Sequence, residues 1–359
     1  MCRVLLAKRV ACLLGLAAIA GSVLGGSQAA PAREAAELVF LTWPDYIHPE
    51  LVADFEAQQG VDVRFSYFDS DDARDRVMAQ SEGRGFDLLL VDNTAVDAYR
   101  RRGWIAPLDQ RALPNLSHLD PSFSAAYPGT DGHGIPYFWG TVGIAYRADL
   151  VDRPIDTWME LYRPDDALVG RLMMLADSYD LIGMALKALG YSMNSTDPDQ
   201  LDAAIALINQ QKPAVASYGT LSLGDDSALL SGEVIAAMSY NGDAAMLMDQ
   251  QPAIRYRVPE EGCAIWTDFL AVGASGNRAL AFAFIDFLNQ PEHAARNAQY
   301  LHYATPNRAA EASLPESFRQ DPLVYPPPAT LARCEHYRPL PADAVRRRSE
   351  AYAAIVYER

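Results

Sequence analysis

Short apolar segments and amphipathic segments alternate regularly in the first part of the sequence, and this alternation most constrains the fold. A short apolar segment predicts a buried strand, whereas apolar residues three and four apart predict a helix with one face on a core. Strands alternating with helices indicate an α/β fold with a mostly parallel sheet flanked by helices. The predicted strands are 37–43, 61–67 and 86–91, and the predicted helices are 49–59, 71–82 and 95–102.

The pattern changes at residues 135–146, where glycine and proline are interleaved with aromatic residues. We predict a hinge strand there that leads into a second domain, for which a chain of 359 residues is long enough. The later predicted elements are strands at 171–175 and 234–240, an extended stretch at 264–272, and helices at 181–189, 199–210, 227–231, 243–250 and 279–289.

The N-terminus has the three parts of a secretory signal peptide: basic residues, an uncharged apolar stretch at 10–24 and a run of small residues. We predict cleavage after Ala29, with Ala30 as the neighbouring alternative, so that residues 1–29 form the signal peptide. The competing interpretation is a membrane anchor. The apolar stretch is short for a bilayer span, and no later segment has about 18 consecutive apolar residues, so we expect an exported chain with no membrane span.

Two of the four cysteines, Cys263 and Cys334, lie beyond the predicted signal peptide. In an exported protein such a pair favours one disulfide. Two separate buried thiols are the alternative, because sequence spacing does not give the distance between the two residues.

Acidic residues outnumber basic ones by 46 to 30, which gives a net charge of −16. Such a surface repels phosphate backbones and attracts cations, so we expect no nucleic-acid partner. An acidic surface also simply keeps a protein soluble, so the charge alone assigns no ligand. The basic run at 346–348 is predicted to be the solvated face of a helix.

The sequence lacks the motifs of common hydrolases and nucleotide-binding enzymes, with no G-x-S-x-G, H-E-x-x-H, P-loop or C-x-x-C. No two histidines are four residues apart, and we expect no metal site, no cofactor and no enzyme activity. A remote alternative is a secreted acidic glycosidase that uses Asp177 and Asp180 as an acid/base pair, although no sugar-binding pattern accompanies them.

Aromatic rings and carboxylates recur together where predicted strands end, which is where open α/β sheets bind ligands. Rings offer cation–π faces and carboxylates accept ammonium protons, so this combination suits an organic ammonium ion. Each residue also has an ordinary alternative, since Asp45 and Asp243 could cap helices and Trp43 could be a core aromatic. The residues concerned are Trp43, Asp45, Tyr46, Asp177, Asp180, Tyr240, Asp243, Trp266 and Asp268.

Several of these residues belong to longer motifs, which include WPDY at 43–46, IPYFWG at 135–140, PEEG at 259–262 and YATPN at 303–307. In this order, from about Leu38 to Ala310, the chain resembles the spermidine/putrescine-binding periplasmic proteins of bacterial ABC transporters. The resemblance implies a monomer with the two-lobed type II periplasmic binding protein fold, in which each lobe has a mostly parallel sheet and two hinge crossovers join the lobes. Lobe 1 would comprise 36–143 plus 268–314, and lobe 2 would comprise 144–267 plus 315–359.

By the same resemblance, the protein would be a periplasmic receptor that binds a polyamine of the putrescine or spermidine class and delivers it to an inner-membrane ABC permease. A receptor or sensor for another cationic amine is the alternative. The implied aromatic box is Trp43, Tyr46, Tyr240, Trp266 and Tyr303, and the implied amine-binding carboxylates are Asp45, Asp180, Asp243 and Asp268, with Asp177 as an additional candidate.

Three departures from the family pattern bear on which amine is bound. Tyr240 stands where the family commonly has Trp, Asp180 stands where it commonly has Glu, and a different turn follows the third strand at 92–94. The match fades near the C-terminus, so residues 335–337 receive no role.

Overall fold

The computed structural model describes residues 36–127 and 129–357, and the predicted signal peptide lies outside these residues. Within the described ranges, no helix is both long enough and apolar enough to cross a membrane.

The first part of the chain forms the strands and helices expected from its alternating pattern. Helix α1 begins where the His48 ring accepts a hydrogen bond from the Glu50 N–H, and it ends at Gly60, whose φ of 66° is the left-handed conformation that glycine adopts readily. The elements are β1 (Ala36–Thr42), α1 (Pro49–Gln59), β2 (Val61–Tyr67), α2 (Asp71–Gln80), β3 (Leu88–Asp92), α3 (Asn93–Arg102), the short helices η1 (Gln110–Ala112) and η2 (Pro114–His118), and α4 (Pro121–Ala126).

The predicted hinge strand is present as β4, which spans Gly134–Arg147. Its first half pairs with β9 (Ala264–Val272), and its second half pairs with β7 and β8. The elements between β4 and β9 are α5 (Trp158–Tyr162), β5 (Leu172–Met174), α6 (Ser178–Ala188), α7 (Pro198–Gln211), η3 (Lys212–Ala214), β6 (Val215–Tyr218), α8 (Ala228–Ser231), β7 (Ala236–Tyr240), α9 (Asn241–Gln250) and β8 (Ile254–Arg257).

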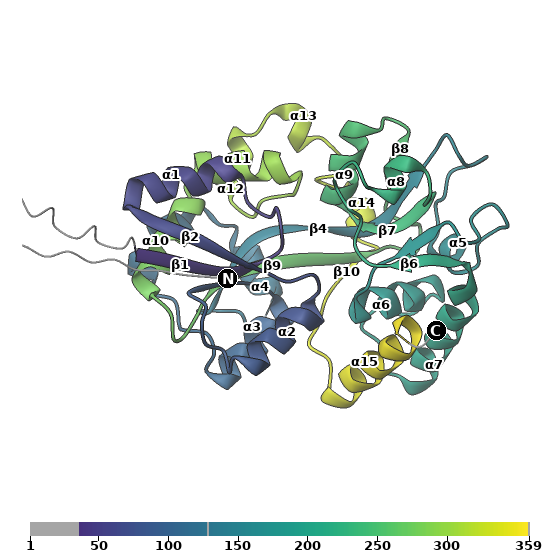
Figure 1. Cartoon of the computed structure of the whole chain (residues 1–359), viewed down its shortest axis with the longest axis horizontal. Helices are drawn as coiled ribbons and strands as arrows, with labels where there is room; N and C mark the ends of the chain where they lie inside the picture. Colours follow the sequence, from purple (N-terminus) through teal and green to yellow (C-terminus); the bar gives the residue numbers. More distant parts are fainter. Residues whose placement is uncertain (1–35, 128, 358–359) are drawn as a thin grey trace, which may run out of the picture. The chain divides into compact units, whose positions relative to one another are not determined.

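The strands join in the order β2-β1-β3-β9-β4-β7-β5-β6 (Figure 1). Pairing is parallel at both ends of this order, as expected, and antiparallel in the middle. The middle differs because β4 and β9 carry the chain directly from one half of the sheet to the other, without a crossover helix. The α/β prediction is confirmed, with a mixed rather than a wholly parallel sheet.

Helices cover both faces of this sheet. In Figure 1, α1, α9 and α11 (Pro291–Leu301) lie above the strands, whereas α2, α3 and α6 lie below them. The core is continuous across the two halves of the sheet, from Phe40 and Phe284 of α10 (Arg278–Leu288) to Leu172 and Leu186.

The C-terminal part returns to the middle of the sheet and then to α6 and α7. Its elements are α12 (Arg308–Ser313), α13 (Glu316–Arg319), α14 (Pro328–Leu331), β10 (Glu335–His336) and α15 (Ala342–Val356). Strand β10 pairs with β9 in parallel. Next to it, Cys263 and Cys334 form a disulfide, with their Cα atoms 4.4 Å apart.

The basic run on α15 is not a solvated face, contrary to the sequence-based expectation. The Arg348 side chain is buried, and its guanidinium donates to the backbone oxygens of Met193 and Ser195. Arg347 pairs with Asp202 of α7. Arg347 and Arg348 therefore dock α15 onto the chain around α6 and α7. Three consecutive residues spread over more than half of a helix's circumference, so they cannot all face solvent when one side of the helix is packed.

Candidate functional site

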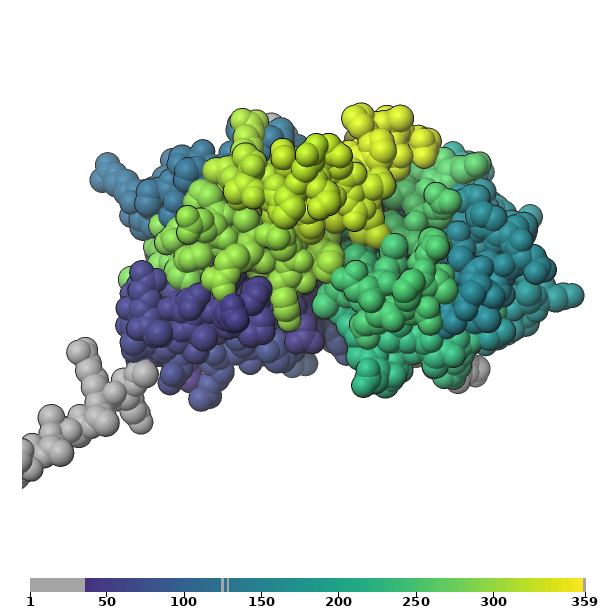
Figure 2. Space-filling model, turned by 90° about the horizontal axis from the view of Figure 1, so that it is seen from above, coloured from purple at the N-terminus to yellow at the C-terminus, as the bar shows by residue number. Residues whose placement is uncertain are grey.

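One cavity of about 690 Å³ lies where the strands end. Its walls come from the loops after β1, β3, β5 and β7, from the first turn of α2 and from β9. Figure 2 shows a recess between the N-terminal elements, in purple, and the region of residues 220–250, in green. Ligand sites of open α/β sheets lie in this kind of place, beyond the carboxyl ends of strands.

All ten residues that the sequence suggested as ligand contacts line this one cavity. They are brought together from several loops, although their role in binding stays a prediction. They are Trp43, Asp45, Tyr46, Asp177, Asp180, Tyr240, Asp243, Trp266, Asp268 and Tyr303.

The capping alternative for the two aspartates is wrong. The residue that caps α1 is His48, not Asp45, and the residue at the N-cap of α9 is Tyr240, not Asp243. Trp43 has both of the roles considered, because it lines the cavity and also packs on Phe68 with the ring centroids 4.4 Å apart.

Four of the aromatic residues form a continuous belt. The ring centroids are 5.7 Å apart for Tyr46 and Tyr303, 4.7 Å for Trp266 and Tyr303, and 6.1 Å for Tyr240 and Trp266. Trp266 meets its two neighbours nearly edge to face, the arrangement that aromatic pairs favour. The belt presents ring faces and edges along which an alkyl chain with positive charges can lie.

Two glycines permit this belt to lie close to the backbone. A Cβ atom on Gly140 would lie 2.5 Å from the Trp266 ring, and one on Gly242 would lie 2.3 Å from the Tyr303 ring. Any larger residue at either position would displace a ring that lines the cavity.

The Asp180 carboxylate accepts hydrogen bonds from two tyrosine hydroxyls. Tyr240 donates its hydroxyl to Oδ2 at 2.9 Å, and Tyr337 donates its hydroxyl to Oδ1. Asp177 positions the same turn, because its side chain accepts the N–H groups of Tyr179 and Asp180 and so caps α6. Burial raises the pKa of Asp180 to about 6, although the two tyrosine hydrogen bonds act to lower it.

Asp177, Asp243 and Asp268 of the cavity also have raised pKa values. Burial, followed by the charge of Asp180, raises the pKa of Asp177 to about 8. Burial raises the pKa of Asp243 to about 6 against a hydrogen bond of 2.9 Å from the Tyr303 hydroxyl. Burial also raises the pKa of Asp268 to about 7. The Tyr46 hydroxyl faces the Asp268 carboxylate, but the two groups do not have the geometry of a full hydrogen bond.

A buried arginine forms part of the cavity wall, and the sequence analysis did not identify it. Arg74 on α2 is 2% exposed and pairs with Asp71, with Asp75 at 3.2 Å and with Asp92 at 2.7 Å. Burial acts to raise the pKa of Asp92, but the Arg74 charge and the hydrogen bonds from Thr94 lower it overall. The available signal was the position of Asp92 at the end of β3.

Tyr337 is the second residue that the sequence analysis missed. It lines the cavity beside Asp180, although the family pattern fades before it is reached. Its place depends on the pairing of β10 with β9 across 71 positions of sequence, which no local pattern reveals.

The electrostatics of the cavity favour a cation. Among the described residues that line it, nine are aspartates and one is arginine, and that arginine is paired with three of the aspartates. Six aspartates are left to compensate positive charge from a ligand.

Comparison with known proteins places this architecture in a family. The family model described as bacterial extracellular solute-binding protein matches residues 50–326. The spermidine/putrescine-binding periplasmic protein of Escherichia coli is 31% identical over 88% of this chain and 90% of its own length. The norspermidine sensor of Vibrio cholerae is 34% identical over 90% of both chains.

The solved structures agree with the sequence relatives. A spermidine/putrescine ABC transporter protein of Listeria monocytogenes superposes with a TM-score of 0.83 at 30% identity, over 90% of this chain and 100% of that one. The fold is thus the type II periplasmic binding protein fold anticipated from the sequence motifs. The chain belongs to the bacterial extracellular solute-binding proteins, in the group of the spermidine/putrescine-binding periplasmic proteins.

Proposed function

We propose that the protein is a periplasmic receptor that binds a polyamine of the putrescine or spermidine class in this cavity and delivers it to an inner-membrane ABC permease. The observation that carries the proposal is the aromatic belt with aspartates beside it. Among the described residues that line the cavity, one arginine balances part of the negative charge of these aspartates. The relatives named above are polyamine-binding or polyamine-sensing proteins, which supports the same ligand class.

The carboxylates lie at different points along the belt. Asp180 accepts the Tyr240 hydroxyl, Asp243 accepts the Tyr303 hydroxyl, and Asp268 lies on β9 two residues after Trp266. A polyamine carries ammonium groups separated by methylene chains, so its charges meet successive carboxylates while its methylenes lie on the rings between them.

The expected free energies of these interactions are large enough for the affinity of a transport receptor. A charge-assisted hydrogen bond contributes about 1.5–3 kcal/mol and a desolvated cation–π contact about 2 kcal/mol. Two of each, less the cost of association, correspond to a dissociation constant on the order of micromolar.

The ligand would lie between the two lobes, 36–143 plus 268–314 and 144–267 plus 315–359. Asp45 and Asp268 belong to the first lobe and Asp180 and Asp243 to the second, and β4 and β9 are the two connections that act as the hinge. Because one cation contacts both lobes, it stabilises the closed arrangement by the contacts made only there.

Isothermal calorimetry on the mature protein tests the ligand class, with putrescine, spermidine and agmatine as amines and with neutral sugars as controls. We expect micromolar or tighter binding of at least one polyamine and no heat from the sugars. Absence of binding to every amine would overturn the proposal, and binding of a sugar would revive the glycosidase alternative.

Uptake of radiolabelled polyamine by cells with and without the gene tests the transport role. We expect uptake to fall in the deletion strain and to return on complementation. Polyamine binding with unchanged uptake would instead assign the protein a sensing role.

A further inference from the structure

The segment of residues 333–338, here called the strap, connects the disulfide to the cavity. It begins beside Cys334, forms β10 against β9, and ends after Tyr337, whose hydroxyl donates to Asp180. The Glu335 N–H donates to the backbone oxygen of Cys263 at 2.9 Å, so the disulfide and the strand pairing fix the same point of the chain.

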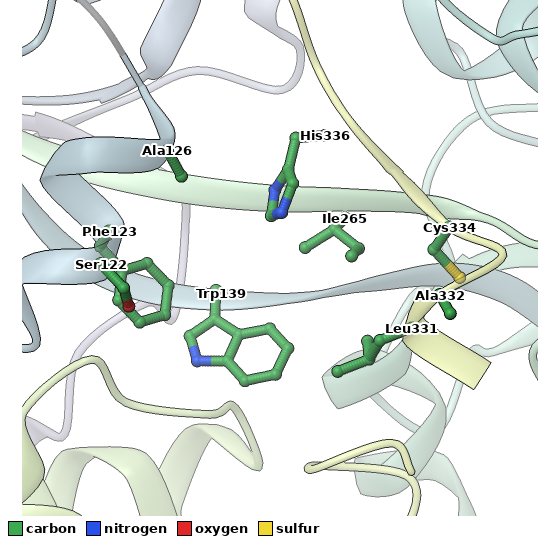
Figure 3. A pocket seen from close by; sticks show the side chains of 9 residues that line it. All are labelled: Ser122, Phe123, Ala126, Trp139, Ile265, Leu331, Ala332, Cys334 and His336. Carbon is green, nitrogen blue, oxygen red and sulfur yellow. The ribbon is translucent and has the colours of Figure 1, made fainter. Parts of the chain in front are cut away.

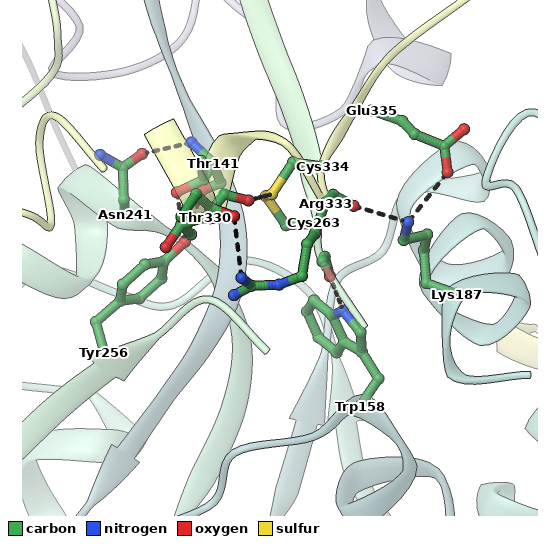
Figure 4. Close-up of a disulfide and its surroundings, with 12 residues drawn as sticks. Thr141, Trp158, Lys187, Asn241, Tyr256, Cys263, Thr330, Arg333, Cys334 and Glu335 are labelled. Atoms are coloured by element: carbon green, nitrogen blue, oxygen red, sulfur yellow. Dashed lines mark hydrogen bonds and ion pairs between the residues drawn. A yellow bond between two sulfur atoms is a disulfide. The ribbon is translucent and has the colours of Figure 1, made fainter. Parts of the chain in front are cut away.

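Hydrogen bonds hold the strap on the side of α6. The Lys187 ammonium donates to the Arg333 backbone oxygen at 3.0 Å and to the Glu335 carboxylate at 3.1 Å (Figure 4). Glu335 also accepts from the Ser192 hydroxyl, and the Asn194 amide donates to the His336 backbone oxygen at 3.0 Å.

Further contacts hold the strap from the other half of the sheet. The Asn93 amide on α3 donates to the Tyr337 backbone oxygen at 3.0 Å. Tyr127 bonds through its hydroxyl to the His336 ring at 2.6 Å and to Thr267, the neighbour of Asp268, at 2.7 Å. The strap therefore contacts both sides of the cavity and carries one of its residues.

The disulfide that anchors the strap is open to reagents from the opposite direction. Cys263 is fully buried, whereas Cys334 is half-buried and lines a second pocket of about 540 Å³. Figure 3 shows Cys334 and Leu331 at one end of this pocket and Ser122 and Phe123 at the other. The volume is large enough for a small thiol, and among the residues that the structure describes this pocket shares no lining residue with the polyamine cavity.

We propose that the Cys263–Cys334 disulfide is a redox-sensitive modification site, and that its reduction lowers polyamine affinity by releasing the strap and with it Tyr337. This inference rests on the proposed polyamine function. The reductant is a dithiol or two molecules of a small thiol. In the first step, one thiolate attacks Cys334 Sγ to form a mixed disulfide, and Cys263 leaves as a thiolate and takes up a proton. In the second step, a second thiol attacks the mixed disulfide and releases Cys334 as a thiol. The products are two protein thiols and one oxidised reductant.

The physical link from strap to ligand is the carboxylate of Asp180. The Tyr337 hydroxyl stabilises the charged form of this carboxylate, so its loss raises the pKa of Asp180 further and leaves less of the ionised form at neutral pH. The titratable groups that face Asp180 are Tyr162 on α5, Asp177 on α6, Tyr240 on β7, Tyr256 on β8 and Tyr337 on the strap.

The first experiment measures the spermidine affinity of the oxidised protein and of the same protein after dithiothreitol treatment, with thiols counted before each titration. We expect no free thiols before treatment and two after it, a roughly tenfold weaker affinity in the reduced protein, and a shift of the affinity–pH profile toward higher pH. Reoxidation should restore the original affinity. Circular dichroism checks that the fold persists, so that any loss is not unfolding.

Two variants test whether a weaker affinity comes from release of the strap or from a general loss of stability. The double variant C263A/C334A should bind as weakly as the reduced protein and should not respond to dithiothreitol. In Tyr337→Phe the oxidised protein should already bind weakly, and reduction should change its affinity much less than it changes that of the unaltered protein.

The outcomes distinguish this inference from the proposed function. Reduced protein with two free thiols and unchanged affinity overturns the redox inference, as does a disulfide that dithiothreitol leaves intact in the folded protein. If the oxidised protein binds no amine, the proposed function fails instead. Hydrogen exchange of the amides of 335–338 then tests the strap alone, with faster exchange on reduction expected and equal exchange overturning the inference.

Discussion

At the scale of single residues, the cavity depends on aspartates whose surroundings favour a positive ligand. Asp268 and Asp243 each combine a raised pKa with an aromatic residue of the belt beside them, Tyr46 and Tyr303 respectively, and neither accepts two tyrosine hydroxyls as Asp180 does. We expect them to be the strongest ammonium anchors.

Replacing Asp268 or Asp243 with Asn should weaken polyamine binding by about 1.5–3 kcal/mol, because each change removes a charge-assisted hydrogen bond. The unfolding of the unliganded variants should change little, since Asn preserves shape and polarity. Calorimetry measures the affinity, and Asp62→Asn, at an exposed position outside the cavity, is the matched control. Unchanged affinity in both cavity variants would exclude these residues as anchors.

The affinity should also rise with pH between about pH 5 and about pH 8. Burial raises the pKa of Asp180 to about 6, of Asp268 to about 7 and of Asp177 to about 8. A bound ammonium ion favours the ionised carboxylates, so binding releases protons over this range. Calorimetry in buffers of different ionisation enthalpy counts those protons, and an affinity independent of pH would contradict the assignment.

The same groups predict how the stability of the unliganded protein depends on pH. Between the ordinary aspartate pKa and about pH 8 the folded chain holds protons that the unfolded chain has lost, so the free energy of unfolding should fall as pH rises through this window. Denaturant unfolding at several pH values measures this trend. Saturating polyamine should reduce or reverse it, because the ligand stabilises the ionised carboxylates.

At the scale of elements, Arg74 connects α2 to the end of β3. Replacing Arg74 with Ala would leave the partly exposed carboxylates of Asp71 and Asp92 without their partner, which costs at most about 3 kcal/mol, the lower end for a broken buried ion pair. We expect the free energy of unfolding, measured with denaturant, to fall by this order. Arg76→Ala on the exposed side of the same helix is the control and should change it by less than about 0.5 kcal/mol. Equal effects of the two substitutions would show that the Arg74 pairs do not stabilise the fold.

The helices and strands themselves were largely predictable, because each depends on nearby residues. The boundaries of α1, β2 and β9 agree with the expected ranges, and α3 begins two residues early because Asp92 accepts the N–H groups of Thr94 and Ala95 and so caps it. The burial of Arg348 was not predictable, because periodicity shows which residues share a helix face but not which face meets α6 and α7.

At the scale of the whole molecule, the proposed function requires the two lobes to close on the ligand. Small-angle scattering of the mature protein should give a smaller radius of gyration with spermidine than without it, because the ligand stabilises contacts made only in the closed arrangement. A neutral sugar at the same concentration is the control. An identical radius with bound spermidine would indicate a rigid cavity.

The amino-acid sequence was sufficient for the α/β class, for most element ranges and for the residue types of the candidate site. Strand and helix patterns depend on side chains a few positions apart, and rings and carboxylates such as Trp43 and Asp45, or Trp266 and Asp268, are also close in sequence. The ring and carboxylate pattern, together with the family motifs, identified ten of the residues that line the cavity.

Tertiary packing was needed to establish which long-range neighbours complete the cavity. The antiparallel pairing of β4 with β9 in the middle of the sheet, the ion pair of Arg74 with Asp92 and the approach of Tyr337 to Asp180 join residues from 18 to 157 positions apart in sequence. Such contacts follow from the pairing of β10 with β9 and from the placement of α2 beside the end of β3, which depend on the burial of the whole core and not on any local pattern.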